Sequence, residues 1–173
     1  MMEIESVPRI IIYQELDELK ARIIQNHTAA GQVASGKTAK SLRIEVDEDS
    51  GRLFGRSPFG TLETGRKGGK VPRQFYLIIR KWMADKGIQA PPIPYKTDRP
   101  HKYTPEERGA LSMAAAIAET IRKKGTKLYR DGGRNDIYSK EIEKTRKILA
   151  ERLSRFIIQK MQHIKLNTET QYK

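Results

Sequence analysis

The stretch GQVASGKT, residues 31–38, constrains this chain most, because it fits the phosphate-loop pattern G-x-x-x-x-G-K-[ST]. A phosphate loop needs a buried strand before its glycines and a long helix after them, since the helix N-terminus holds the phosphates. Here apolar residues recur at helical spacing between positions 16 and 24, and an alternating, strand-like segment starts only four residues after Thr38. We therefore expect a turn between a helix and a strand, not a nucleotide-hydrolysing enzyme.

Composition narrows the possible functions further. The chain has 173 residues, which fits one domain or one domain with an extended arm. It has no cysteine, so disulfides and zinc–thiolate sites are excluded, and no apolar run is long enough to cross a bilayer. Its three histidines, His27, His101 and His163, lack metal-ligand spacing, and no nucleophile motif is present. We expect no catalytic residues, no metal and no cofactor.

Charge is distributed unevenly along the chain. The net charge is +13, but residues 1–50 carry six Lys/Arg against nine Asp/Glu, whereas residues 51–173 carry 28 against 12. The densest basic stretch is residues 52–81, with eight basic residues and Glu63 as the only acid. Such asymmetry indicates a surface that meets a polyanion or an acidic partner, although a basic face that only aids solubility fits the charge equally well.

The first half of the sequence predicts a helix, a hairpin and a loop. Residues 10–31 have the apolar stripe of an amphipathic helix, and residues 42–46 alternate like a half-buried strand. Residues 47–51 read as the hairpin connection, in which Gly51 suits a positive φ, and residues 52–55 as the returning strand. A short strand is expected at 61–63. The glycine-rich basic stretch 64–70 is expected to be a flexible loop.

The second half predicts three helices and a tether. Pro72 is placed to start a helix that ends at Gly87, with five large apolar residues on one face and Trp82 as a core anchor: Phe75, Ile78, Ile79, Trp82 and Met83. The proline-rich residues 89–103 read as an extended arm. Thr104, Pro105 and Glu107 form a capping-box signature for a helix reaching about residue 124, and a last helix is expected from Ser139.

These elements predict an α+β fold. A small antiparallel β-sheet, made of the hairpin plus short strands, is packed by an N-terminal helix and two or three further helices, with an extended arm. The expected division is an α+β core over residues 1–88, a tether or arm over 89–103, and a helical C-terminal elaboration packing on the core over 104–173.

Residues 35–73 resemble the tail-completion and neck proteins of tailed bacteriophages, which join head to tail. The resemblance rests on SGKTAKSLRIEV (35–46), GRLFG (51–55), PFGTLETGRK (58–67) and the proline at 72. It covers about a quarter of the chain. Members usually end soon after the proline, whereas about a hundred residues follow here. Large neck ring proteins of short-tailed phages, including crAss-like ones, carry such elaborations.

The resemblance implies a structural virion protein without catalysis. It would form a ring homo-oligomer in the virion neck, between portal and tail, lining or sealing the DNA channel, with portal, tail or other neck proteins as partners. A basic loop would face packaged DNA or the portal; its residues are Arg66, Lys67, Lys70 and Arg73. The arm would contact a neighbouring subunit through Pro91, Pro92, Ile93, Pro94 and Tyr95. The alternative is a small basic nucleic-acid-binding protein.

Overall fold

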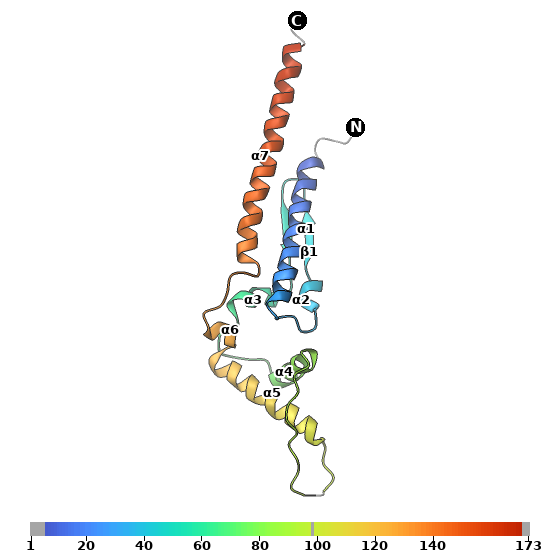
Figure 1. Ribbon diagram of the computed structural model, residues 1–173, viewed down its shortest axis with the longest axis vertical. Coiled ribbons are helices and arrows are strands. Elements are labelled where there is room, and N and C mark those ends of the chain that lie inside the picture. Colours follow the sequence, from blue (N-terminus) through green and yellow to red (C-terminus); the bar gives the residue numbers. More distant parts are fainter. Residues whose placement is uncertain (1–5, 98, 171–173) are drawn as a thin grey trace. The chain divides into compact units, whose positions relative to one another are not determined.

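The structure, a computed structural model, describes residues 6–97 and 99–170 (Figure 1). Helices dominate it, and the sheet in the described part has two strands, which confirms the α+β class. The elements in chain order are α1 (Ser6–Ala29), α2 (Lys37–Lys40), β1 (Arg43–Val46), β2 (Gly51–Phe54), a 3-10 turn (Ser57–Gly60), α3 (Thr61–Thr64), α4 (Phe75–Asp85), α5 (Pro105–Lys124), α6 (Lys127–Arg130) and α7 (Ser139–Thr170). Each of its helices in the described part is too short or too polar to cross a bilayer.

The chain folds into two compact units that do not follow its order. The α1–α7 unit comprises the described residues of Met1–Ala30, Ala39–Ser57 and Asn135–Lys173, and the α4–α5 unit comprises those of Gly31–Thr38 and Pro58–Arg134. Neither unit corresponds to the stretches 1–88, 89–103 and 104–173 expected from the sequence. The two long helices within residues 104–173 belong to different units, because α5 packs on α4 and α7 packs on α1.

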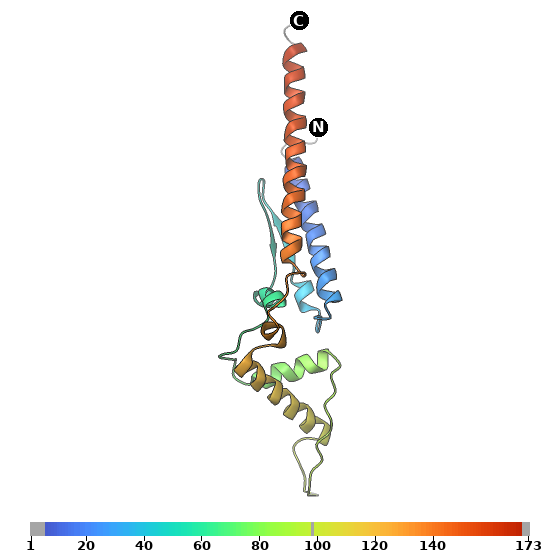
Figure 2. The same cartoon turned by 60° about the vertical axis from the view of Figure 1, so that its left-hand side comes forward.

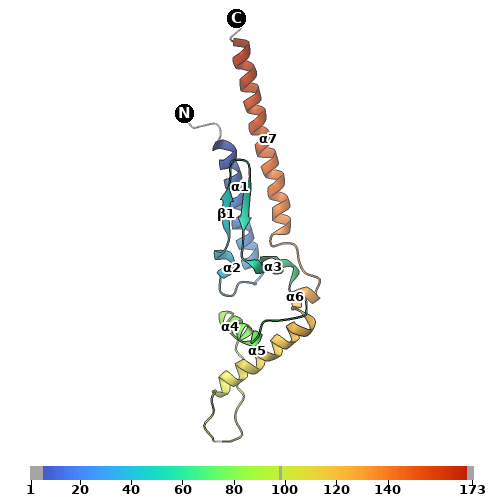
Figure 3. The ribbon, with the colours of Figure 1, turned by 180° about the vertical axis from the view of Figure 1, so that it is seen from behind.

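In the α1–α7 unit, the two long helices lie side by side and antiparallel (Figures 1 and 3). Buried apolar residues of α1 form the core with two residues from outside it: Ile12, Leu16, Leu19, Ile23, Leu42 and Ile137. Polar pairs fix the register along the seam. The Arg152 guanidinium lies 2.6 Å from the Glu15 carboxylate, whose side chain is 3 % exposed. Near the other end, Arg22 donates to Thr145 at 2.8 Å and pairs with Glu141 at 3.0 Å.

The hairpin packs on α1 through Gly51. β1 and β2 are antiparallel, with Ile44 opposite Leu53, and the Asp47 N–H donates to the Ser50 carbonyl at 2.8 Å in the connection. Gly51 does not have the positive φ that its place in the turn predicted. Glycine is needed at this position for a different reason. A Cβ there would lie 2.4 Å from Cγ2 of Ile12 and 2.7 Å from Cδ1 of Leu16. The requirement is close approach of strand to helix, which the turn sequence alone does not reveal.

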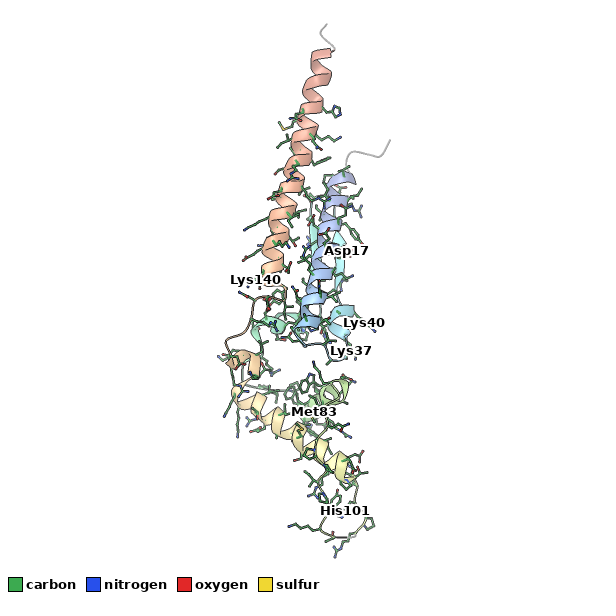
Figure 4. The ribbon with its side chains drawn as sticks, in the orientation of Figure 1. Asp17, Lys37, Lys40, Met83, His101 and Lys140 are labelled. Carbon is green, nitrogen blue, oxygen red and sulfur yellow. The ribbon has the colours of Figure 1, made fainter. Side chains whose placement is uncertain are left out.

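In the α4–α5 unit, two helices pack through small residues of α5. Ala114 and Ala118 are buried against Ile79 and Met83 of α4, and Met83 lies where the two helices meet (Figure 4). The capping box at Thr104 is present as predicted: the Glu107 N–H donates to the Thr104 hydroxyl and the Thr104 N–H to the Glu107 carboxylate. The chain from α4 to α5 leaves the helices as a long loop and returns (Figure 2).

Two local predictions were wrong. Residues 61–63, expected as a short strand, are in helix α3, which follows directly from the 3-10 turn over Ser57–Gly60. The helix expected to start at Pro72 begins at Phe75, after Gln74 in a left-handed conformation with φ 57°. In both places the apolar pattern was too short to distinguish one helical turn from a strand or an extended lead-in.

Candidate functional site

The phosphate-loop pattern lies in a connection between helices. The 24-residue helix α1 precedes it, and α2, a single turn that includes Lys37, follows it (Figure 4). The segment is held by the α4–α5 unit: the Gln32 amide donates to the Leu62 carbonyl at 3.0 Å, and the Lys86 ammonium donates to the Gly31 carbonyl. Phosphate binding requires a strand before the loop and a long helix after it, and this segment has neither. The helix–turn–strand interpretation is confirmed.

The basic loop, residues 64–70, is hydrogen-bonded to the turn between α5 and α6. The Arg66 N–H donates to the Thr126 hydroxyl at 2.9 Å, and the Thr126 N–H donates back to the Arg66 carbonyl at 2.9 Å. The Gly69 N–H donates to the Arg122 carbonyl at 2.8 Å. These three bonds join segments more than fifty residues apart, so the loop has a defined path in place of the flexibility expected from its composition.

The glycines of this loop allow the backbones to touch. A Cβ on Gly65 would lie 2.4 Å from the Tyr129 nitrogen, and one on Gly68 would lie 2.7 Å from the Lys123 carbonyl oxygen. From the other side, a Cβ on Gly125 would lie 2.6 Å from the Arg66 carbonyl oxygen. Each of these neighbours is a backbone atom, which cannot move aside as a flexible side chain can. Close packing at Gly65 and Gly68 and a positive φ of 144° at Gly69, not mobility, explain why this loop is rich in glycine.

The loop joins a larger cationic surface, which we call the cationic end. Arg66, Lys67 and Lys70 from the predicted site lie on the loop, and Arg73 follows shortly after it in the chain. The loop is bonded to the C-terminal end of α5 and to the start of α6, which supply five more basic residues that the sequence analysis did not assign: Arg122, Lys123, Lys124, Lys127 and Arg130. The α4–α5 unit as a whole carries 18 Lys/Arg against seven Asp/Glu, so +11 of the net +13 lies in it.

Two acids lie among these cations: Asp131, which pairs with Lys127 at 2.5 Å, and Glu119. Glu119 lies 2.6 Å from the Arg122 guanidinium and 3.1 Å from the Lys123 ammonium. Hydrogen bonds from these two side chains lower the pKa of Glu119 to about 2, and the same pair raises the pKa of Arg122. Glu119 therefore stays ionised at any physiological pH and neutralises one cation of the cluster. The rest of the cationic end keeps its positive potential.

A cavity of about 750 Å³ opens beside the cationic end. Its wall is apolar and comes from both helices of the unit and from α6: Phe75, Ile79, Trp82, Ile117, Ile121 and Leu128. Arg66, Lys127 and Arg130 also line it, and the Arg66 guanidinium lies 5.5 Å from the centroid of the Phe75 ring. An apolar wall with positive charge beside it suits a ligand that is apolar and anionic at once.

Trp82 was expected to be a core anchor, and that expectation was wrong. It is 39 % exposed and lines the cavity, while Ile78 on the same helix is 53 % exposed. Only Ile79 and Met83 of the predicted face are buried in the α4–α5 core. The face is split because α5 presents a narrow row of alanines, which covers less of α4 than the apolar stripe is wide.

The segment 89–103 folds back on its own unit. The Ile93 N–H donates to the Pro105 carbonyl at 2.9 Å, and Arg108 donates to the Pro94 carbonyl at 3.2 Å while its guanidinium lies 4.6 Å from the Tyr95 ring centroid. Tyr95 also stacks on His101, with ring centroids 3.4 Å apart. His101 lies in the far part of the loop (Figure 4). The predicted contact of this arm with another subunit stays a prediction.

The remaining candidate groups are scattered. His27 is buried on α1, whereas His101 and His163 are exposed. Within residues 6–97 and 99–170, no three His, Cys, Asp or Glu side chains come together as a metal site would require. Comparisons of the chain with protein-family models, with curated proteins and with solved structures found no match.

Proposed function

We propose that this chain is a structural subunit of a ring in the neck of a tailed bacteriophage, between portal and tail, where it lines or seals the DNA channel. The resemblance of residues 35–73 to neck and tail-completion proteins motivates the proposal. The observation that carries it is exposed apolar surface on the α1–α7 unit, in a chain that is otherwise strongly charged. Five large apolar residues there are more than 40 % exposed: Ile10, Tyr13, Ile157, Ile158 and Met161.

The register of the helix pair places exposed apolar residues of both helices at the same level along it. Asn26 meets Glu141, Arg22 meets Thr145 and Glu15 meets Arg152, so the helices run antiparallel in a constant register. Continued along the pair, that register brings the levels of Ile10 and Ile157 together, and α7 extends beyond the start of α1. Exposed large apolar residues on both helices at one end of a two-helix pair favour a protein–protein contact there.

The hairpin offers a second contact. β1 and β2 form a two-stranded sheet in the part of the chain that the structure describes, so each strand has one edge that pairs with no strand there. Open edges accept a strand from another chain, and a head-to-tail contact of this kind closes a ring when the rotation permits. The cationic end would face packaged DNA or an acidic portal surface, through contacts to phosphates that are independent of sequence.

Oligomeric state tests the proposal. Mass photometry and negative-stain microscopy of the full chain, alone and with candidate portal protein, should show rings or recruitment to the portal. The variant Ile157→Lys/Met161→Lys should weaken assembly, whereas the matched charge additions Ser154→Lys/Gln159→Lys, at exposed polar positions of the same helix, should not. A wild-type chain that stays monomeric and ignores portal at every concentration refutes the proposal.

A second candidate function is favoured by the charge of the α4–α5 unit. Its net +11 and the cationic end also suit a small nucleic-acid-binding protein. Such a protein would bind DNA or RNA as a monomer at physiological salt. Lys123→Glu/Lys124→Glu would then reduce its affinity and the dependence of that affinity on salt.

A further inference from the structure

The cavity of the α4–α5 unit combines two kinds of wall. Phe75, Ile79 and Trp82 supply apolar surface from α4, and Ile117, Ile121 and Leu128 supply it from α5 and α6. Arg130 and Lys127 add positive charge from one turn of helix, and the Lys127 ammonium also pairs with Asp131 at 2.5 Å. The Arg66 guanidinium is held nearby by donating to the Lys70 carbonyl at 2.6 Å. The matching ligand carries a large aliphatic side chain between carboxylates.

We propose that residues 1–5 of a neighbouring copy of this chain dock in the cavity. The inference rests on the ring assembly proposed above and names one contact within it. The segment reads Met-Met-Glu-Ile-Glu, so it has three apolar residues and two acids, with Ile4 between the acids and no base. Ile4 would enter the apolar part of the cavity, while Glu3 and Glu5 would meet Lys127 and Arg130.

The composition of the chain selects this segment. Three stretches lie outside the described ranges: residues 1–5, residue 98 and residues 171–173. Residue 98 is a single aspartate, and residues 171–173 read Gln-Tyr-Lys, which is basic. Only residues 1–5 combine apolar side chains with negative charge, the complement of an apolar cavity with cations beside it.

The ring assembly proposed above makes a neighbouring copy the donor. Docking between copies would link each subunit to the next, as a ring requires.

Trp82 provides a direct measurement, because it is the only tryptophan of the chain and lines the cavity. The probe is an acetylated, amidated peptide of residues 1–6, titrated into the full chain carrying Ile4→Asp, which cannot fill its neighbour's cavity. We expect a saturable shift of Trp82 emission to shorter wavelength. The peptide with Ile4→Ser should give no shift. No shift with the native peptide, or an equal shift with the Ile4→Ser peptide, overturns the inference.

Charge reversal tests the rim of the cavity. In the same titration, Lys127→Glu/Arg130→Glu should weaken the peptide's affinity about fivefold or more, as expected for the loss of two partly exposed ion pairs. The control Arg146→Glu/Lys147→Glu adds the same charge on exposed positions of α7 and should leave the affinity unchanged. Equal weakening by both double variants would attribute the effect to net charge alone and would overturn the specific contact.

Assembly separates this inference from the ring proposal. By mass photometry, Ile4→Asp should lower the fraction of assembled protein relative to the native chain at equal concentration. Unchanged assembly of Ile4→Asp overturns the docking inference and leaves the ring intact. If the peptide binds at Trp82 but the chain never assembles with itself or with portal, the ring is refuted. The binding would still support the specificity of the cavity for residues 1–5. If dilution of the native chain to the monomer leaves its Trp82 emission as short in wavelength as in the assembled protein, the segment docks within one chain. That result overturns docking between copies.

Discussion

Gly109 on α5 should not tolerate even a methyl group. A Cβ there would lie 2.1 Å from the carbonyl oxygen of Pro91 and 3.4 Å from Cα of Pro92. An ordinary contact between a carbon and a carbonyl oxygen is about 3.3 Å, so the loop would have to move by more than 1 Å. Two consecutive prolines make that movement difficult, because their φ angles are fixed.

The net effect of Gly109→Ala is the difference of two terms. Overpacking a close contact costs about 1–3 kcal/mol, and this contact is at the severe end. Alanine in place of glycine inside a helix would otherwise stabilise by about 1 kcal/mol. We therefore expect Gly109→Ala to lower the free energy of unfolding of the α4–α5 unit by about 1–2 kcal/mol.

Urea unfolding followed by Trp82 fluorescence measures this change, because Trp82 lies on α4 and reports on the α4–α5 unit. The control is Ser112→Ala, an exposed position on the same helix, which should change stability by no more than about 0.5 kcal/mol. Limited trypsin digestion supplies a second readout, since displacement of the loop should speed cleavage at the exposed Lys96. A gain near 1 kcal/mol with unchanged digestion would refute the reasoning, because it would mean that residues 89–103 do not lie against α5.

Three further predictions test other contacts. Arg152→Met leaves the carboxylate of Glu15 buried without its guanidinium, so urea unfolding followed by circular dichroism should show a loss of about 2–3 kcal/mol, against almost none for the exposed Arg155→Met; equal losses would contradict it. Met83→Ala should cost about 2–5 kcal/mol in the same assay, because Met83 is 2 % exposed; a loss under 1 kcal/mol would mean a loosely packed core. The depressed pKa of Glu119 means that its contribution to stability is complete above pH 4.5 and is lost as the pH falls towards 2; Glu119→Gln should flatten the stability profile in that window, and identical profiles would contradict the pairing.

Local chemistry was sufficient to predict most elements. The stripe of α1, the capping box at Thr104 and the hairpin around Ser50 were predicted correctly, because each depends on residues within a few positions of one another. The basic loop was located correctly from its composition, and its three basic residues were named, together with Arg73 just after it. The same reasoning failed at residues 61–63, where three residues cannot display a period.

Tertiary structure decided what these elements contact. The glycines at 51, 65 and 109 are needed because distant segments approach them closely, and nothing near them in the sequence indicates those partners. The sequence likewise could not show that α5 would leave Trp82 beside a cavity or that Arg122 and Lys127 would join the basic loop. Periodicity and capping act over a few residues and are encoded locally, whereas burial and close approach depend on which surfaces meet, and that is determined only when the whole chain packs.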